Sequence, residues 1–247
     1  YHADGWLLLI NGVQSSHVIV GQPRMLDFEY MRWIVAVLDS HIQTHLNPEK
    51  LRITHLGGGA CSLARYCADV YPNSRNTVVE LDAKLAEHVR DWFDIPKSPR
   101  VKIRVGDAGT VTRSFAPASR DVVIRDVFAV DKTPAELTGV DFVRTVDNSL
   151  APGGLYILNC GDDRTLNAAR AEAAALLEVF EYVSIVADSA MLKGRRRGNI
   201  ILAGSHVPLP QLGSAEAASI SRVLMGGGVP AQYWDTEKVR AFARKGA

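Results

Sequence analysis

Three acidic side chains end or follow apolar runs, a placement typical of carboxylates that face a ligand. Glu80 ends the run TVVE, Asp107 follows the run VKIRVG, and Asp126 ends the run DVVIRD. Open α/β sheets bind their ligands at the carboxyl ends of the strands. A carboxylate there can accept hydrogen bonds from ribose hydroxyls or take a proton from an amine. Alternatively, Asp126 could cap a helix and Asp107 could stabilise a turn.

Three consecutive glycines supply the second chemical feature. Gly57, Gly58 and Gly59 follow an apolar run and precede a segment of helical length. Glycine lets the chain turn sharply, and the free N–H groups of the next helix then face whatever lies over the turn. Glu80 lies about 20 residues further on, the spacing of a carboxylate that binds ribose in nucleotide-type folds. An adenosine-containing ligand is therefore expected at this turn.

Alternating strands and helices must position these residues. Strands are predicted at 52–56, through Val78 and Val79, and at 101–105, 121–125, 155–160, 182–187 and 199–203. Helices are predicted at 26–45, 84–93, 141–150 and 165–179, with a turn at 152–154. The pattern predicts an α/β, Rossmann-like sheet with helices on both faces.

The two ends of the chain differ from this central part. Asn11-Gly12 between two apolar runs predicts a β-hairpin within residues 1–25. Residues 26–207 are expected to form the nucleoside-binding domain, and residues 208–247 a helical tail. In that tail, helices are predicted at 213–225 and from Asp235 or Thr236 through Arg244.

Composition limits the classes of partner. The 247 residues carry a formal net charge of +1, which gives no reason to expect nucleic acid or a membrane as partner. The cysteines Cys61, Cys67 and Cys160 lack CxxC spacing, so buried thiols in a reducing cytoplasm are expected; a metal site on them is the alternative.

Two further groups of residues have alternative interpretations. His41 and His45 have a spacing that can bind metal, but no third ligand is evident, so a solvated helix face and no metal are expected. The run Arg195–Arg197 predicts a solvated turn. Attraction of an anionic substrate or partner is its functional alternative.

The last two predicted strands suggest an antiparallel end to the sheet, as in the class I S-adenosylmethionine-dependent fold. A nicotinamide-binding sheet usually continues parallel, and Ser62 stands where its fingerprint prefers glycine, so that class is a minor alternative. Taken in order, the motifs across residues 7–205 resemble a spermidine synthase, a polyamine aminopropyltransferase. They are LLLINGVQS, LDFEYMRW, HLGGGA, VVELD, VGDA, DVVIRD, SLAPGG and GNIILAGS.

The resemblance implies roles for individual residues. Gln14 would lie near the sulfonium nucleoside, the glycines Gly57–Gly59 would form its loop, and Glu80 would bind its ribose. Asp107 and Ala108 would contact its adenine. Asp126 would be the catalytic base, with Tyr30 assisting it.

The sequence departs from the family pattern at three positions. The family's glycine loop continues with an aspartate that holds the amine of decarboxylated S-adenosylmethionine, and here Ala60 stands there. One charge-assisted contact, worth about 1.5–3 kcal/mol, is therefore missing. Ala129 replaces a second aspartate that helps bind the amine substrate, and Met31 replaces a histidine. Asp131 is a candidate substitute for the acid missing at Ala129.

The resemblance implies that an aminopropyl group passes from decarboxylated S-adenosylmethionine to a diamine such as putrescine. That donor would be a co-substrate that leaves methylthioadenosine, with no tightly bound cofactor, and a homodimer is expected. Two alternatives remain. One is an S-adenosylmethionine-dependent methyltransferase, and the other is a catalytically inactive nucleoside-binding homologue.

Overall fold

The computed structural model describes residues 4–129 and 132–244 of the chain. The strands of this part are β1 (Trp6–Ile10), β2 (Val13–Val18), β3 (Arg52–Leu56), β4 (Arg75–Glu80), β5 (Val101–Val105), β6 (Arg120–Arg125), β7 (Leu150–Asp162), β8 (Tyr182–Asp188), β9 (Gly198–Ser205) and β10 (Ala231–Trp234). Its α-helices are α1 (Glu29–His45), α2 (Ser62–Val70), α3 (Ala83–Trp92), α4 (Ala108–Arg113), α5 (Gly139–Ser149), α6 (Asn167–Val179), α7 (Ser189–Leu192), α8 (Ala215–Met225) and α9 (Thr236–Ala243). Two short 3-10 turns are η1 (Pro48–Lys50) and η2 (Ala135–Leu137).

Eight strands form one sheet in the order β10-β8-β9-β7-β6-β3-β4-β5. Strands β7, β6, β3, β4 and β5 are parallel to one another. Strand β9 pairs antiparallel with β7 and with β8, which produces the predicted antiparallel end of the sheet. The predicted α/β, Rossmann-like class is therefore confirmed.

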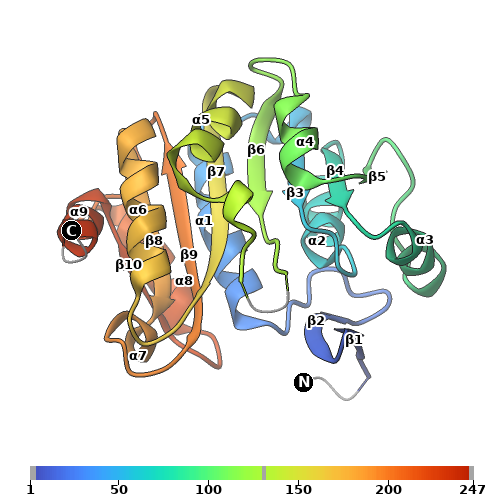
Figure 1. Ribbon diagram of the computed structural model, residues 1–247, viewed down its shortest axis with the longest axis horizontal. Coiled ribbons are helices and arrows are strands. Elements are labelled where there is room, and N and C mark those ends of the chain that lie inside the picture. Colours follow the sequence, from blue (N-terminus) through green and yellow to red (C-terminus); the bar gives the residue numbers. More distant parts are fainter. Residues whose placement is uncertain (1–3, 130–131, 245–247) are drawn as a thin grey trace.

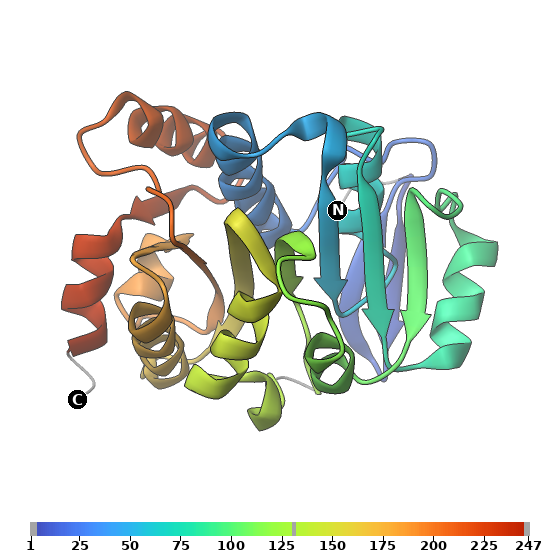
Figure 2. The same cartoon turned by 90° about the horizontal axis from the view of Figure 1, so that it is seen from above.

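Helices cover both faces of the sheet (Figure 2). Helices α1, α2 and α8 lie on one face, and α4, α5 and α6 lie on the other. The central strand β6 is buried between these layers, and Val122, Val123 and Ile124 are at most 1% exposed. Strands buried on both faces are expected to be continuously apolar, as this run is.

The predicted N-terminal hairpin is also confirmed. Strands β1 and β2 pair antiparallel, with Ile10 opposite Val13 and a two-residue turn between them. Asn11 and Gly12 both have positive φ, at 51° and 78°, as a type I′ turn requires. The hairpin lies at the edge of the sheet toward which the parallel strands point (Figure 1).

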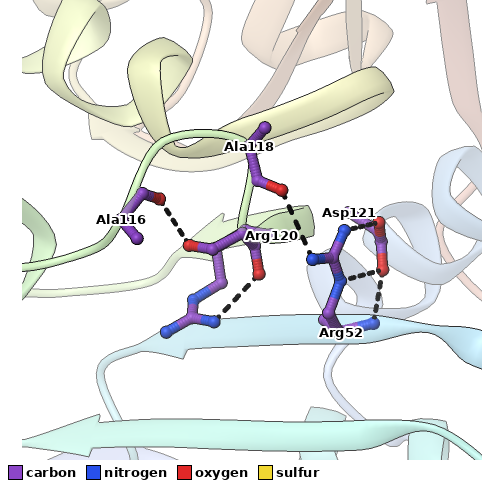
Figure 3. A network of polar contacts seen from close by, with 6 residues as sticks. Arg52, Ala116, Ala118, Arg120 and Asp121 are labelled. Atoms are coloured by element: carbon purple, nitrogen blue, oxygen red, sulfur yellow. Dashed lines mark hydrogen bonds and ion pairs between the residues drawn. The ribbon is translucent and has the colours of Figure 1, made fainter.

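The opposite edge, at the amino ends of the strands, is held by an ion pair between β3 and β6 (Figure 3). The Arg52 guanidinium donates to both oxygens of Asp121, at 2.6 and 3.0 Å. The Arg52 amide donates to the same carboxylate at 2.7 Å, and its Nη1 donates to the Ala118 carbonyl at 3.3 Å. These contacts link the amino ends of β3 and β6.

Two predicted boundaries are wrong. Helix α1 begins at Glu29 rather than at residue 26, because the Arg32 side chain binds the carbonyls of Leu26 and Asp27, each at 2.6 Å. The turn predicted at 152–154 lies inside β7, where the pairing of β6 with β7 shifts register and Gly153 has a φ of +79°.

The C-terminal segment contains both expected helices, capped by the side chains of Ser214 and Asp235. It also contains β10, which was not predicted and pairs antiparallel with β8. In the part of the chain that the structure describes, no helix is both long enough and apolar enough to cross a membrane.

Candidate active site

The glycine turn brings the ends of β3 and β6 together. Gly57 and Gly59 have positive φ, at 91° and 47°, which side chains rarely tolerate. A Cβ atom at Gly57 would overlap the carbonyl oxygen of Asp126. The backbone of β3 can therefore approach the residue that follows β6 only because position 57 carries no side chain.

Glu80, at the end of β4, organises this turn. Its Oε2 accepts hydrogen bonds from the amides of Gly58 at 3.0 Å and Gly59 at 3.3 Å. Its Oε1 accepts one from the amide of Asp82 at 2.9 Å. A carboxylate has about four acceptor positions, so Glu80 retains about one beyond these three bonds.

Asp126 follows β6 and is held by two neutral donors. The Tyr30 hydroxyl donates to Oδ2 at 3.0 Å, and the Asn159 amide donates to Oδ1 at 2.9 Å. Burial raises the pKa of Asp126 above its ordinary value, and the two hydrogen bonds oppose that rise. Burial also raises the pKa of Tyr30 well above 10, so its hydroxyl stays protonated and donates. Asp126 forms no ion pair with another residue that the structure describes, an arrangement that suits a proton acceptor.

The other predicted nucleoside contacts lie around the same edge of the sheet. Gln14 is exposed on β2. Asp107 follows β5 and caps α4 by accepting from the Thr110 amide at 2.7 Å, which lowers the pKa of its carboxyl group. Ala108 is the buried first residue of α4. Asp107 thus has a local structural role, as the alternative interpretation of a turn aspartate anticipated.

Two residues of this site were not predicted. Asn159, in β7, is 1% exposed, and its Oδ1 has no hydrogen-bond partner among the described residues. Ser16, in β2, accepts a hydrogen bond from the Ala60 amide at 3.1 Å, so the hairpin contacts the glycine loop directly. A polar residue inside the apolar run YILNC was the signal for Asn159.

The residues after the glycines are closed to solvent. Ala60 is 0% exposed. Cys61 lies in the left-handed region, with a φ of 58°, and precedes α2 rather than lying within it. Burial raises the pKa of the Cys61 thiol to about 12, so it is not a nucleophile. Met31 is also buried, whereas Ala129 is exposed; Asp131 lies outside the described residues.

The paired histidines do not form the predicted solvated face. His41 is 3% exposed and its Nε2 lies 2.8 Å from the Gly153 carbonyl, while His45 binds the Pro208 carbonyl at 2.9 Å. Burial lowers the pKa of His41 to about 4. Within residues 4–129 and 132–244, no three His, Cys, Asp or Glu side chains are grouped as metal ligands.

The sheet order and the glycine turn followed by an acid define the class of protein by its fold: a class I S-adenosylmethionine-type fold. No protein-family model matches the chain. The crystal structure of a probable spermidine synthase from Corynebacterium glutamicum superposes on it with a TM-score of 0.96 and 60% sequence identity, covering 98% of this chain and 87% of that one. The chain therefore belongs to the spermidine synthase family.

Curated relatives include transferases of two kinds. The eEF1A lysine and N-terminal methyltransferase of Mus musculus is 33% identical over 128 residues, which is 47% of this chain and 18% of that protein. The polyamine aminopropyltransferase of Vibrio vulnificus is 26% identical over 149 residues, which is 60% of this chain and 48% of that protein. The chain thus spans about a fifth of the first relative and about half of the second.

Proposed function

We propose that this protein transfers a carbon group from a sulfonium nucleoside to an amine nitrogen. The observation that carries the proposal is the half-buried Asp126 carboxylate, which lies against the glycine turn and is held by Tyr30 and Asn159, with no ion pair to another described residue. Glu80, on the other side of that turn, has acceptor capacity for a ribose. A nucleoside over the turn would have its sulfonium end near Asp126.

The chemical step needs a base but no metal ion or redox group. An ammonium has no lone pair, so the Asp126 carboxylate first accepts one of its protons. The nitrogen lone pair then forms a bond to the carbon beside the sulfonium. The carbon–sulfur bond breaks, and its electron pair leaves with the sulfur as a neutral thioether. Tyr30 keeps its proton and orients the carboxylate.

Family membership favours aminopropyl transfer as the form of this reaction. The donor would then be decarboxylated S-adenosylmethionine, the acceptor a diamine such as putrescine, and the product methylthioadenosine. In this proposal Gln14 lies near the sulfonium group, and Asp107 and Ala108 contact the adenine. The donor is a co-substrate, with no cofactor bound tightly.

A specific observation favours methyl transfer as the second candidate. Ala60 is fully buried and hydrogen-bonded through its amide to Ser16, so this position offers no carboxylate for the free amine of a decarboxylated donor. A site without that carboxylate loses its main basis for selecting the decarboxylated form. The mouse methyltransferase at 33% identity supports the same candidate.

Calorimetric titration and the transfer of a labelled group from the donor distinguish aminopropyl transfer from methyl transfer. The protein would be titrated with S-adenosylmethionine, its decarboxylated form and methylthioadenosine, and then incubated with donors labelled in the methyl or the aminopropyl group. Aminopropyl transfer fails if the decarboxylated donor binds no better than the intact one. Binding of none of the three would support the inactive homologue instead.

Two broader expectations also remain proposals. Cys61, Cys67 and Cys160 are free, buried thiols, which supports a reducing cytoplasmic location. The exposed apolar side chains of β1, among them Trp6 at 66% and Leu9 at 53%, support a homodimer. Sedimentation of the purified chain measures its oligomeric state and so tests the homodimer.

A further inference from the structure

The basic run predicted as a solvated turn lies at the same edge of the sheet as Asp126. Strand β7 runs parallel to β6, and β9 runs antiparallel to β7, so Asp162 at the end of β7 pairs with Gly198 at the start of β9. The segment that joins β8 to β9, including Arg195–Arg197, is therefore at the carboxyl edge. Figure 1 shows α7, within this segment, at the same edge as the N-terminal hairpin.

Two neighbouring segments add positive charge to this run. We define the basic rim as six exposed side chains: Lys132, Arg164, Lys193, Arg195, Arg196 and Arg197. A Cβ atom at Gly194 would overlap the Arg164 carbonyl, so the β8–β9 segment contacts the loop after β7. The Asp163 carboxyl group has a lowered pKa, first because of hydrogen bonds from Thr165 and further because of Lys132 and Arg197. The approach of Gly194 to Arg164 thus joins two of these segments, and the charge of Lys132 from the third also acts on Asp163.

The acids near the basic rim are already engaged. Asp188 pairs with Arg196 at 2.6 Å and caps α7. Asp162 accepts from the Ala169 amide at 2.7 Å, and Asp163 accepts from the amide and the hydroxyl of Thr165 at 2.7 and 2.6 Å. By contrast, four members of the rim form no ion pair with another described residue. They are Lys132, Arg164, Lys193 and Arg195.

The basic rim lies on the acceptor side of Asp126. The proposed nucleoside site involves β3, β4 and β5, on one side of β6, while β7, β9 and β8 lie on the other side. Strand β7 continues three residues from Asn159 to Asp162, or about 10 Å at about 3.3 Å per residue. An acceptor that reaches Asp126 from this side therefore passes the basic rim. A polyamine is positively charged, so the rim would repel it.

We propose that the amine acceptor is carried by an acidic peptide segment, whose carboxylates bind the basic rim while its amine reaches Asp126. This proposal rests on the proposed transfer from a sulfonium nucleoside to an amine, and it puts a peptide amine in place of the diamine as acceptor. Strands β6, β7, β9 and β8 are neighbours, so their carboxyl edge beside the rim is about 14 Å wide at about 4.8 Å per strand. That width matches four or five extended peptide residues at about 3.4 Å each. A lysine side chain or an N-terminus supplies the aliphatic ammonium that Asp126 deprotonates, whereas nucleobase amines are conjugated and carry no such proton.

The test compares two peptides with the same single lysine, one with four flanking glutamates and one with glutamines in their place. Fluorescence anisotropy measures binding, and a labelled sulfonium donor measures transfer. The acidic peptide is expected to bind at least 10-fold more tightly, with the label on its lysine. The double variant Lys193→Glu and Arg195→Glu is expected to lose most of this difference. An oligonucleotide of equal charge is expected to bind more weakly than the acidic peptide.

A matched control uses the opposite edge of the sheet. Lys50 and Arg75 are exposed near the amino ends of β3 and β4, so Lys50→Glu with Arg75→Glu makes the same change in net charge away from Asp126. This control is expected to bind the acidic peptide as the wild type does. Circular dichroism and donor titration check that both double variants remain folded.

Several outcomes would overturn the inference. They are equal binding of the two peptides, equal or tighter binding of the oligonucleotide, and an equal effect of both charge reversals. Labelling of putrescine at the same rate in the wild type and in the Lys193→Glu, Arg195→Glu variant would overturn it while leaving the proposed function intact. Absence of label on every acceptor would overturn both.

Discussion

Strand β6 has an aspartate at each end, and the two are held in opposite ways. Asp121, near its amino end, receives three hydrogen bonds from Arg52, two of them from the guanidinium. Asp126, after its carboxyl end, receives one from Tyr30 and one from Asn159, both neutral. A guanidinium stabilises the charged form of its carboxylate, whereas burial beside neutral groups destabilises it. The same residue type is therefore a structural anion at one end and, in the proposed mechanism, a proton acceptor at the other.

The difference extends to the surroundings of each aspartate. At the amino edge the Arg52 side chain also binds the Ala118 carbonyl, and its contacts lie within the chain (Figure 3). At the carboxyl edge Asn159 Oδ1 has no partner among the described residues. Buried polar atoms without partners are uncommon and indicate sites where a ligand or water completes the bonding. The aspartate at the amino end is thus neutralised by an arginine, whereas the one at the carboxyl end lies beside an amide oxygen that can still accept a hydrogen bond.

The largest expected effect comes from removing the charge of Asp126. The variant Asp126→Asn should lower turnover at least 100-fold, since a positioned general base contributes about 10²–10⁴-fold. Donor affinity, measured by titration, should be unchanged because Glu80 and the glycine turn remain. The fold should survive, because the Asn159 amide can rotate and offer its free Oδ1 to the new amide group. Unchanged turnover would remove Asp126 from the proposed mechanism.

A smaller effect is expected from Asn159, which acts through Asp126. The variant Asn159→Leu should lower turnover about 10-fold at neutral pH, the loss of about 1.4 kcal/mol, as one hydrogen bond to a charged group is removed. Its hydrogen bond lowers the pKa of Asp126, so the pKa rises without it. Since the base must be deprotonated, activity is lost as pH falls through that pKa, and the acidic limb of the kcat profile should move to higher pH. A uniform loss at all pH values would indicate a structural role only.

A still smaller effect is expected from the tyrosine. The variant Tyr30→Phe removes the donor to Oδ2 and should lower turnover about 5-fold, about 1 kcal/mol for one hydrogen bond. In the Asp126→Asn background the same change should have little further effect, because the two residues act as one unit. Additive losses in this double-mutant cycle would mean that Tyr30 contacts the substrate independently of Asp126.

The features of the site that could be predicted are those marked by residue type and spacing along the sequence. Three glycines, an acid about 20 residues later and an acid ending a strand identified Gly57, Glu80 and Asp126. Asn159 was missed because a single polar residue in an apolar run is consistent with a core strand. Its role becomes visible only in the folded chain, where β7 pairs with β6 and the Asn159 amide donates to Asp126.

The remaining differences have the same cause, namely contacts distant in sequence. His41 is buried because its helix packs where it meets the Gly153 carbonyl, 112 residues away. Strand β10 has four residues and exists through its pairing with β8. The start of α1 is a local exception, because it is fixed by Arg32, whose side chain binds the carbonyls of residues five and six positions earlier. Local periodicity carries no information about such partners.

The smallest expected effect on activity, and the sharpest contrast with Asp126, comes from Asp121. The variant Asp121→Asn should leave turnover and donor affinity unchanged, because the residue lies at the opposite edge of the sheet. It should lower the free energy of unfolding by about 1 kcal/mol, measured by urea denaturation. The loss is limited because the Arg52 side chain is 40% exposed and water replaces part of the interaction. If turnover fell as far in Asp121→Asn as in Asp126→Asn, the distinction between a structural and a reactive aspartate on this strand would be wrong.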